Sequence, residues 1–240
     1  MIKLVINMRG FFMYNWSYLV FMLPCLILSL ICNASVKSNF SKYSQVPNSR
    51  RMTGAQAAQA VLNAHGVTGV RIEPVRGSLT DHFDPRSNVI RLSEPVYNST
   101  SVAAVGVACH EAGHACQHAE QYFPNKVRSA ILPIANFGSR LSWLFLIVGM
   151  ILPVQYNFVV IIGIVMYSAS VLFTIATLPV EFNASSRALK TIQSTGMLSA
   201  QEYPGAQKVL RAAAMTYVAA AATSIAQLLR LIMVFGNRRK

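Results

Sequence analysis

Charge is scarce in this chain of 240 residues, and acidic charge is the scarcest. Only 12% of the residues are charged, against about a quarter in an ordinary soluble domain, and Asp and Glu together number 8. Hydrophobic residues make up 53% of the chain, and several apolar runs are as long as a bilayer is thick. This composition excludes a disordered chain and a purely aqueous enzyme, and it predicts a membrane protein.

Cysteine is scarce too, and the four residues lie within apolar sequence, which excludes a disulfide framework. They are Cys25, Cys32, Cys109 and Cys116. The formal net charge of +13 comes from dispersed Lys and Arg residues, which in a membrane protein usually report topology. A nucleic-acid partner would need a basic face with aromatic or groove-fitting elements, so we expect the lipid bilayer as a partner and no nucleic acid.

Four apolar runs predict a polytopic bundle of membrane-spanning helices. Each approaches the ~20 residues needed to cross the hydrocarbon core, provided that the second begins near Ile131 and tolerates Pro133 and Arg140. The runs are residues 11–32, 141–154, 159–178 and 212–229. Because only the uncharged Gln155-Tyr156-Asn157 separates the second run from the third, we expect these two to form a membrane hairpin.

The first run has two interpretations. Lys3 and Arg9 form a basic head, and Cys32-Asn33-Ala34 ends in a small residue, as in a cleavable signal peptide. The run exceeds the ~7–15 apolar residues of a signal core, so we favour an uncleaved anchor. At the other end, Asn237 to Lys240 is expected to be a solvated tail.

The sequence between the first two runs predicts a small polar domain. Residues 33–53 are polar and basic, which suggests a juxtamembrane linker on anionic head groups. Thr53 is expected to cap a short helix that Gly66 stops. Alternating residues near 70–72 and 88–93 predict a small sheet or hairpin, and an Ala-rich stretch without proline predicts a helix over residues 102–118.

That last helix contains the sequence His110-Glu111-Ala112-Gly113-His114. Residues four apart project from one face of a helix, so both imidazoles can bind one ion while Glu111 reaches a water on that ion. The alternative, a polar helix face buried by hydrogen bonds, is disfavoured because a buried carboxylate between two imidazoles is costly without an ion or a partner.

A catalytic zinc site takes three protein ligands and keeps one position for water. Glu181 is the leading candidate for the third ligand, because two membrane crossings return it to the side of His114. Its alternative use is as a charge at the start of a helix that Thr177 caps and Pro179 begins. Glu202 is a weaker candidate, since a capping box with Ser199 already employs it.

Other polar residues are candidates for roles outside the metal ligand set. Three imidazoles on consecutive turns of a straight helix cannot converge on one ion, so His118 is either a second-shell or substrate-side group or an ordinary interfacial residue. Tyr203 and His82 are possible oxyanion donors. The strand over residues 88–93 can pair with an extended substrate if it lies at the cleft edge.

Two motifs together resemble the YugP-like neutral zinc metallopeptidases of bacterial membranes. They are His110-Glu111-Ala112-Gly113-His114-Ala115-Cys116-Gln117-His118 and Leu178-Pro179-Val180-Glu181-Phe182-Asn183-Ala184-Ser185. The likeness extends over almost all of the chain after about residue 33. It implies one zinc ion bound by His110, His114 and Glu181, with Glu111 as the general base.

The sequence is more distantly similar to the HtpX-type membrane gluzincins, whose metal-binding helices lie at the cytoplasmic membrane face. Those proteins place an aspartate four residues after the ligand glutamate, and here that position is Ser185. The role of orienting a histidine therefore falls to weaker substitutes, Asn183 or Ser185.

We therefore expect a mainly α protein: a polytopic membrane helical bundle of about four spans with a small α+β zincin-like polar domain that carries the HExxH helix. The expected parts are an anchor (1–35), the zincin-like region (36–129), a membrane hairpin (130–179), and the ligand-glutamate helix with the last span (180–240).

The expected function is that of a membrane-bound zinc metalloendopeptidase acting on peptides or membrane proteins, and the sequence does not indicate an oligomeric state. The alternative is a non-catalytic zinc-binding scaffold, which the intact glutamate and the open fourth position disfavour. Lys126 and Arg128 follow the motif closely, which disfavours an intramembrane protease. Most basic residues lie in the polar regions, so we expect a bacterial inner-membrane protein with a cytoplasmic active site.

Overall fold

The computed structural model describes the backbone of residues 2–236 and the side chains of residues 16–235. The sequence analysis assigned roles to Lys3, Arg9 and the tail from Asn237 to Lys240. These residues lie outside the part of the chain whose side chains the structure describes. The helices are α1 (Ile2–Ser44), α2 (Gly54–Ala64), α3 (Glu94–Tyr97), α4 (Val102–Ala119), α5 (Phe123–Ile151), α6 (Phe158–Ser194) and α7 (Tyr203–Gly236). The strands are β1 (Arg71–Val75), β2 (His82–Asp84) and β3 (Val89–Ser93), and a short 3-10 helix, η1, spans Val154–Tyr156.

The chain divides into two compact units that are each discontinuous in sequence. The helical unit comprises residues 1–31, 127–177 and 217–240, and the polar unit comprises residues 32–126 and 178–216. Helices α1, α5, α6 and α7 therefore contribute one part to each unit.

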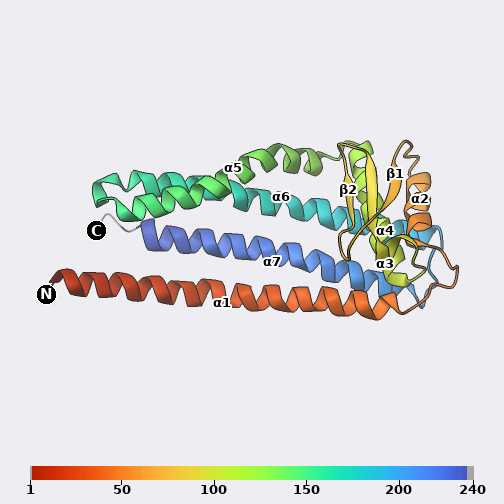
Figure 1. Cartoon of the computed structure of the whole chain (residues 1–240), viewed down its shortest axis with the longest axis horizontal. Helices are drawn as coiled ribbons and strands as arrows, with labels where there is room; N and C mark the ends of the chain where they lie inside the picture. Colours follow the sequence, from red (N-terminus) through yellow and green to blue (C-terminus); the bar gives the residue numbers. More distant parts are fainter. Residues whose placement is uncertain (1, 237–240) are drawn as a thin grey trace. The chain divides into compact units, whose positions relative to one another are not determined.

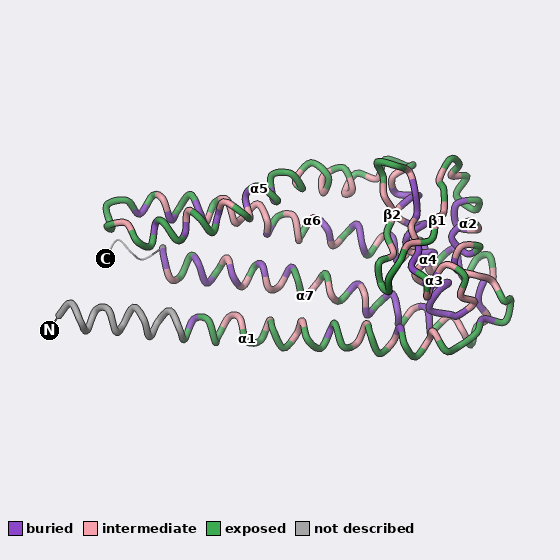
Figure 2. The backbone as a smooth tube through the Cα atoms, in the orientation of Figure 1, coloured by how far each residue is buried: buried purple, intermediate pink, exposed green. Residues whose placement is uncertain are grey.

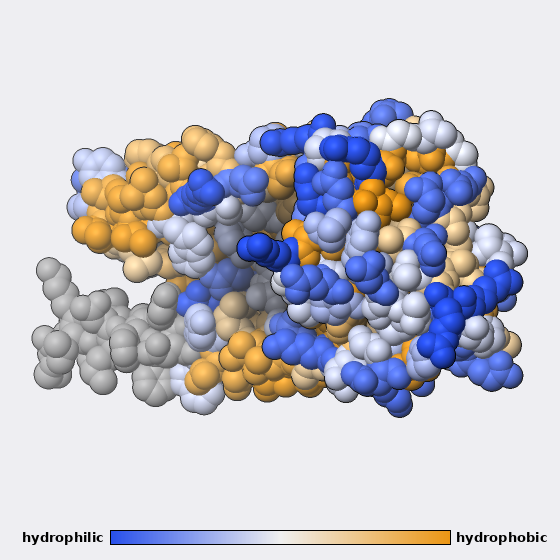
Figure 3. Space-filling model, turned by 45° about the vertical axis from the view of Figure 1, so that its right-hand side comes forward, coloured by the Kyte–Doolittle hydropathy of each residue, from blue (hydrophilic) through white to orange (hydrophobic). Residues whose placement is uncertain are grey.

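Four helices are long and apolar enough to cross a membrane within the part of the chain that the structure describes. These candidate spans are Trp16–Ser44, Phe123–Ile151, Val154–Ser194 and Tyr203–Phe235. The predicted fold class, a mainly α membrane bundle with a small α+β domain, is confirmed. Apolar residues cover much of the face of the helical unit that is visible in Figure 3, as expected for a surface in contact with lipid.

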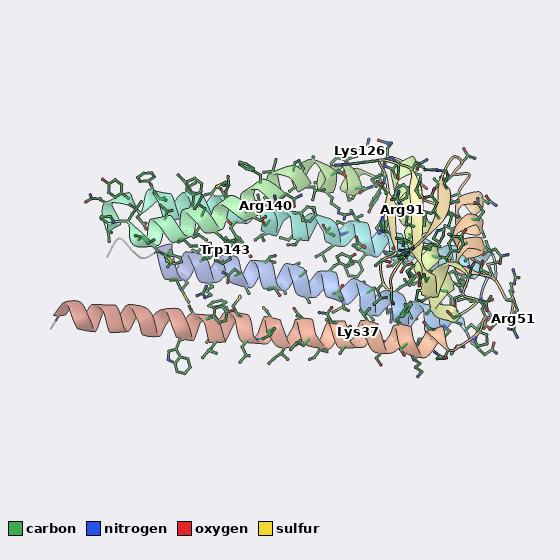
Figure 4. The ribbon with its side chains drawn as sticks, viewed as in Figure 1. Lys37, Arg51, Arg91, Lys126, Arg140 and Trp143 are labelled. Atoms are coloured by element: carbon green, nitrogen blue, oxygen red, sulfur yellow. The ribbon has the colours of Figure 1, made fainter. Side chains whose placement is uncertain are left out.

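In the helical unit, α5 and α6 form the predicted hairpin. Helix α5 includes Pro133, and it also carries Arg140 and Trp143 (Figure 4). The two helices approach closely at glycines: a Cβ atom on Gly138 would lie 2.8 Å from the carbonyl oxygen of Met166. Small residues at such contacts are typical of helix packing in membranes, where close approach replaces the hydrophobic effect.

Two predicted helix boundaries are wrong. Helix α1 continues to Ser44, so the first half of the expected linker is helical; Asn33 to Ser44 contains neither Pro nor Gly to end it. Helix α6 also runs without a break through Pro179. Thr177 does not cap a new helix, because its hydroxyl donates to the carbonyl of Phe173 within α6.

The polar unit contains a three-stranded sheet in the order β1-β3-β2, which lies beside α4 (Figure 1). Strand β3 pairs in parallel with β1 and antiparallel with β2. Residues 88–93 could pair with a substrate only if they lay at a cleft edge, and that condition is not met, because β3 is the central strand. Its side chains at Val89, Ile90 and Leu92 are fully buried.

Helix α4 is the centre of the core of the polar unit. Thirteen of its residues are buried, and Figure 2 shows the concentration of buried backbone there. The predicted cap of the neighbouring helix α2 is confirmed: Thr53 and Gln56 form a reciprocal capping box. A helix so tightly enclosed holds its few polar side chains in fixed positions.

Glu202 joins two segments of the polar unit that are distant in sequence. Its carboxylate accepts hydrogen bonds from the backbone N–H of Ser49 (2.7 Å) and of Ser199 (2.8 Å). Burial raises the pKa of Glu202, but the two N–H donors outweigh burial and hold the pKa below its ordinary value of 4.5. Glu202 is therefore occupied structurally, as the capping box predicted.

We expect Glu202→Ala to lower the stability of the protein by about 1 kcal/mol, because three hydrogen bonds to the carboxylate at a partly exposed site are lost. The apparent Tm in detergent should fall by about 2–4 °C. The folded pKa is depressed, so the stabilisation is present above pH 4.5 and is lost below it. Acidification should therefore shrink the difference in Tm. The control, Glu73→Ala, breaks only an exposed pair with Arg71 and should leave Tm unchanged; an equal effect of both variants would contradict the assignment.

Candidate metal centre

Helix α4 presents the predicted histidine pair to one point. The helix begins after Ser101, whose hydroxyl accepts a hydrogen bond from the N–H of Ala104. The rings of His110 and His114 lie edge to face with their centroids 4.7 Å apart. Their side chains are only 13% and 16% exposed, so one turn of α4 holds two nearly buried imidazoles together.

Helix α6 brings Glu181 to the same point. Its Oε2 atom lies 3.4 Å from Nε2 of His110 and 3.4 Å from Nε2 of His114. The side chain of Glu181 is 3% exposed, yet Oε2 has no hydrogen-bond partner among the described residues. One candidate ligand atom from each of the three residues lies within 4.8 Å of the other two.

These distances fit a zinc ion. Zinc binds imidazole nitrogen and carboxylate oxygen at about 2.0–2.2 Å, and a tetrahedral arrangement then separates the ligand atoms by about 3.3–3.6 Å. A buried carboxylate oxygen without a hydrogen bond is costly unless a cation satisfies it. The donor set and the unpaired oxygen of Glu181 are both those that a divalent ion requires.

The close approach of α4 and α6 depends on Gly113, which lies between Glu111 and His114 in the motif. A Cβ atom at Gly113 would lie 2.7 Å from the backbone carbonyl oxygen of Ala184. Only a residue without a side chain allows this contact. The glycine of the motif therefore sets the distance between the helix that carries the histidines and the helix that carries Glu181.

The Nδ1 atom of each histidine has a polar neighbour. Ser185 Oγ lies 3.1 Å from Nδ1 of His110, and Gln117 Oε1 lies 3.0 Å from Nδ1 of His114. Of the two residues expected to orient a histidine, Ser185 is the one that contacts an imidazole directly. Asn183 contacts neither imidazole directly; its Oδ1 accepts a hydrogen bond from Gln117 Nε2 at 2.9 Å.

Gln117 is the site residue that sequence reasoning missed. It is fully buried, and its Nε2 donates to the carbonyl of Val180 (2.8 Å) as well as to Asn183. Two acceptors on the nitrogen side fix the direction of the amide, so its oxygen must face His114 and accept a proton from Nδ1. His114 is thereby held in the tautomer whose Nε2 lone pair faces Glu181.

A chain of contacts extends this orientation away from the site. Arg187 Nε donates to the same Oδ1 of Asn183 (2.7 Å), and Arg187 Nη1 donates to Glu120 Oε1 (2.6 Å). The guanidinium fixes the amide of Asn183, which fixes the amide of Gln117. Gln117 lies one turn beyond His114 on the same helix, which is the only signal in the sequence that points to it.

Other candidate residues lie apart from the cluster of His110, His114 and Glu181. The ring of His118 packs against Phe83 of β2, with centroids 5.7 Å apart. His82 is exposed, and its Nδ1 lies 2.8 Å from the carbonyl oxygen of Thr80. Burial raises the pKa of Cys109, and raises that of Cys116 to about 11. Both thiols therefore stay protonated, which makes them poor metal ligands.

The electrostatics of His114 reflect the two carboxylates near it. Burial lowers the pKa of His114, but the adjacent Glu181 carboxylate and the negative charge of Glu111 outweigh burial and raise the pKa above 6.5. Without a metal ion, the carboxylates therefore favour a proton on His114. A metal ion must displace that proton, because only the neutral imidazole is a ligand.

Gly113→Ala should weaken zinc binding at least tenfold, because the added methyl group forces α6 away from α4 and separates the ligands. Competition with a chromogenic chelator measures the affinity. The matched control is Gly106→Ala on the same helix, where the added Cβ would meet Ala206 at 3.4 Å, and its affinity should stay within twofold of the wild type. Unchanged zinc binding in Gly113→Ala would refute the spacing role of this glycine.

Gln117→Met, which keeps the volume but removes the acceptor, should weaken zinc binding by about 10–100-fold, as other outer partners of metal-bound histidines do. Nitrogen-15 NMR of the imidazoles should show the second tautomer of His114 appearing in the variant. The control is Gln59→Met on the exposed face of α2, where Gln59 bonds only Asn63. A lower Tm with unchanged zinc affinity and tautomer would reduce Gln117 to a packing residue.

Comparison with known proteins agrees with this geometry. A family model described as "Putative neutral zinc metallopeptidase" matches residues 18–236. The chain is 50% identical over 212 residues to the "Putative membrane protease YugP" of Bacillus subtilis (strain 168), an alignment that covers 88% of this chain and 93% of that protein. No solved structure matches the chain. Since the family match covers most of the sequence, the chain belongs to the family described as "Putative neutral zinc metallopeptidase".

Proposed function

We propose that this protein is a membrane-bound zinc metalloendopeptidase. The observation that carries the proposal is the meeting of two imidazole Nε2 atoms with one buried carboxylate oxygen, each at 3.4 Å, beside the glutamate of the same motif. The family and the name of the Bacillus subtilis relative both support a metalloprotease role.

In this proposal His110, His114 and Glu181 hold one zinc ion, which supplies a Lewis acid and lowers the pKa of a bound water. Glu111 is the general base. It is 8% exposed, and its charge acts on His114, so it lies beside the histidine pair in a site largely shielded from solvent. It accepts the proton of the attacking water and passes that proton to the leaving amine.

The three-residue donor set favours catalysis over the scaffold alternative. Structural zinc sites are closed by four protein ligands, usually with cysteine. Among the described residues the cluster contains three ligands and no cysteine, which leaves a position for water. The substrates are peptides or membrane proteins, and the site faces the cytoplasm from a bacterial inner membrane, as the distribution of basic residues favours.

The test combines metal content with proteolysis. Purified wild-type protein should contain one zinc per chain and degrade casein in detergent. Glu111→Gln should retain the zinc but lose about 10²–10⁴-fold in turnover, because the base is gone. His114→Ala should lose both. Glu73→Gln, which changes a half-buried residue of β1, should lose neither.

Two results would contradict the proposal. Full turnover in Glu111→Gln would remove the proposed base, and stoichiometric zinc in His114→Ala would place the metal elsewhere. Zinc that remains bound in an inactive wild-type protein would favour the scaffold alternative.

A further inference from the structure

A groove of about 560 Å³ runs between α6 and α7 within the polar unit. Its walls are mainly apolar and include Phe182, Leu189, Leu210 and Met215. Phe182 is 47% exposed and Met215 is 44% exposed. Both residues belong to candidate membrane spans, where apolar exposure is common, so the concave shape of the groove and its charges carry the argument.

The groove reaches the candidate metal centre through one residue. Ser185 lines the groove, and its hydroxyl lies 3.1 Å from Nδ1 of His110. Phe182, another lining residue, directly follows Glu181 in the sequence. Nε2 of the His110 ring faces Glu181, so the width of one imidazole separates Ser185 in the groove wall from the metal-facing atoms of the site.

Two cations lie along the groove without acidic partners. They are Lys190 of α6 and Arg211 of α7, both exposed. The lining residues include no Asp or Glu, and among the described residues neither cation forms an ion pair. In a chain with so few acids, these two positive charges are left for a ligand to pair with.

We propose that this groove is a substrate subsite that binds a large apolar side chain next to an acidic one, with Lys190 and Arg211 pairing the carboxylate. The proposal rests on the proposed peptidase function and names its substrate class. A peptide suits the groove better than a lipid does, because the contact between Ser185 and His110 ties the groove to the place where a scissile bond would lie.

Binding is measured without cleavage. Full-length, zinc-loaded Glu111→Gln protein in neutral detergent is titrated into dye-labelled octapeptides that differ only in a central pair, Leu-Glu, Leu-Gln, Leu-Lys or Ser-Glu. Fluorescence anisotropy should rank Leu-Glu tightest. Loss of the acid should weaken binding about fivefold, the range of an exposed ion pair. Loss of the apolar side chain should weaken binding at least about tenfold, because a buried Leu side chain is removed.

Variants then test the two cations. The double variant Lys190→Gln/Arg211→Gln should bind Leu-Glu no more tightly than Leu-Gln, whereas its affinity for Leu-Gln should match that of the parent. Arg211→Glu leaves one cation beside one carboxylate and should abolish the preference, whereas Lys190→Glu/Arg211→Glu should reverse it toward Leu-Lys. The control is Lys208→Gln, an exposed lysine on α7 outside the groove, which should change nothing.

Several outcomes would overturn the subsite. Equal affinity for all four peptides, or an equal loss for Leu-Glu and Leu-Gln in the double variant, would do so. So would displacement of Leu-Glu by nanodiscs of phosphatidylglycerol but not of phosphatidylcholine, which would assign the cations to a lipid. Charge-selective binding by a protein whose wild type cleaves nothing would support the subsite and contradict the peptidase function instead.

Discussion

The contact between Gly113 and the backbone of Ala184 is the constraint on which the site depends. Zinc requires its ligands at defined distances, and among the described residues three atoms from two different helices meet that requirement. The backbone of α6 can come near α4 only where α4 has no side chain. A single absent methyl group thus decides whether Glu181 reaches the two imidazoles at 3.4 Å.

The groups that contact the two histidines from outside the metal-binding cluster are neutral. The site already contains two carboxylates, those of Glu111 and Glu181, whose negative charge a divalent cation would balance. The groups that orient the histidines are a hydroxyl and an amide, Ser185 and Gln117, and a further carboxylate there would leave an excess negative charge in a nearly buried place. Neutral orienting groups therefore suit a site that already has two acids.

Helix α6 contributes side chains both to the candidate metal centre and to the groove between α6 and α7. One side of α6 supplies Glu181 and contacts α4, and the lining of the groove adds Phe182 and Lys190 from the same stretch. Because α6 continues through Pro179 as one helix, the angular relation between Glu181, Phe182 and Ser185 is that of a regular helix. The candidate metal ligand and the groove are thereby linked by the helical period.

Local sequence determined the features that depend on short-range periodicity. The helical spacing of His110 and His114, the caps at Thr53 and Ser101, and the lengths of the apolar runs follow from geometry within a few residues. Counting membrane crossings brought Glu181 to the correct side. The roles of Gly113 and Gln117 were decided by tertiary structure, because each depends on a backbone carbonyl of α6 some 60–70 residues away. The central place of β3, the unbroken course of α6 and the groove were decided in the same way, since burial and packing between distant segments override local propensity.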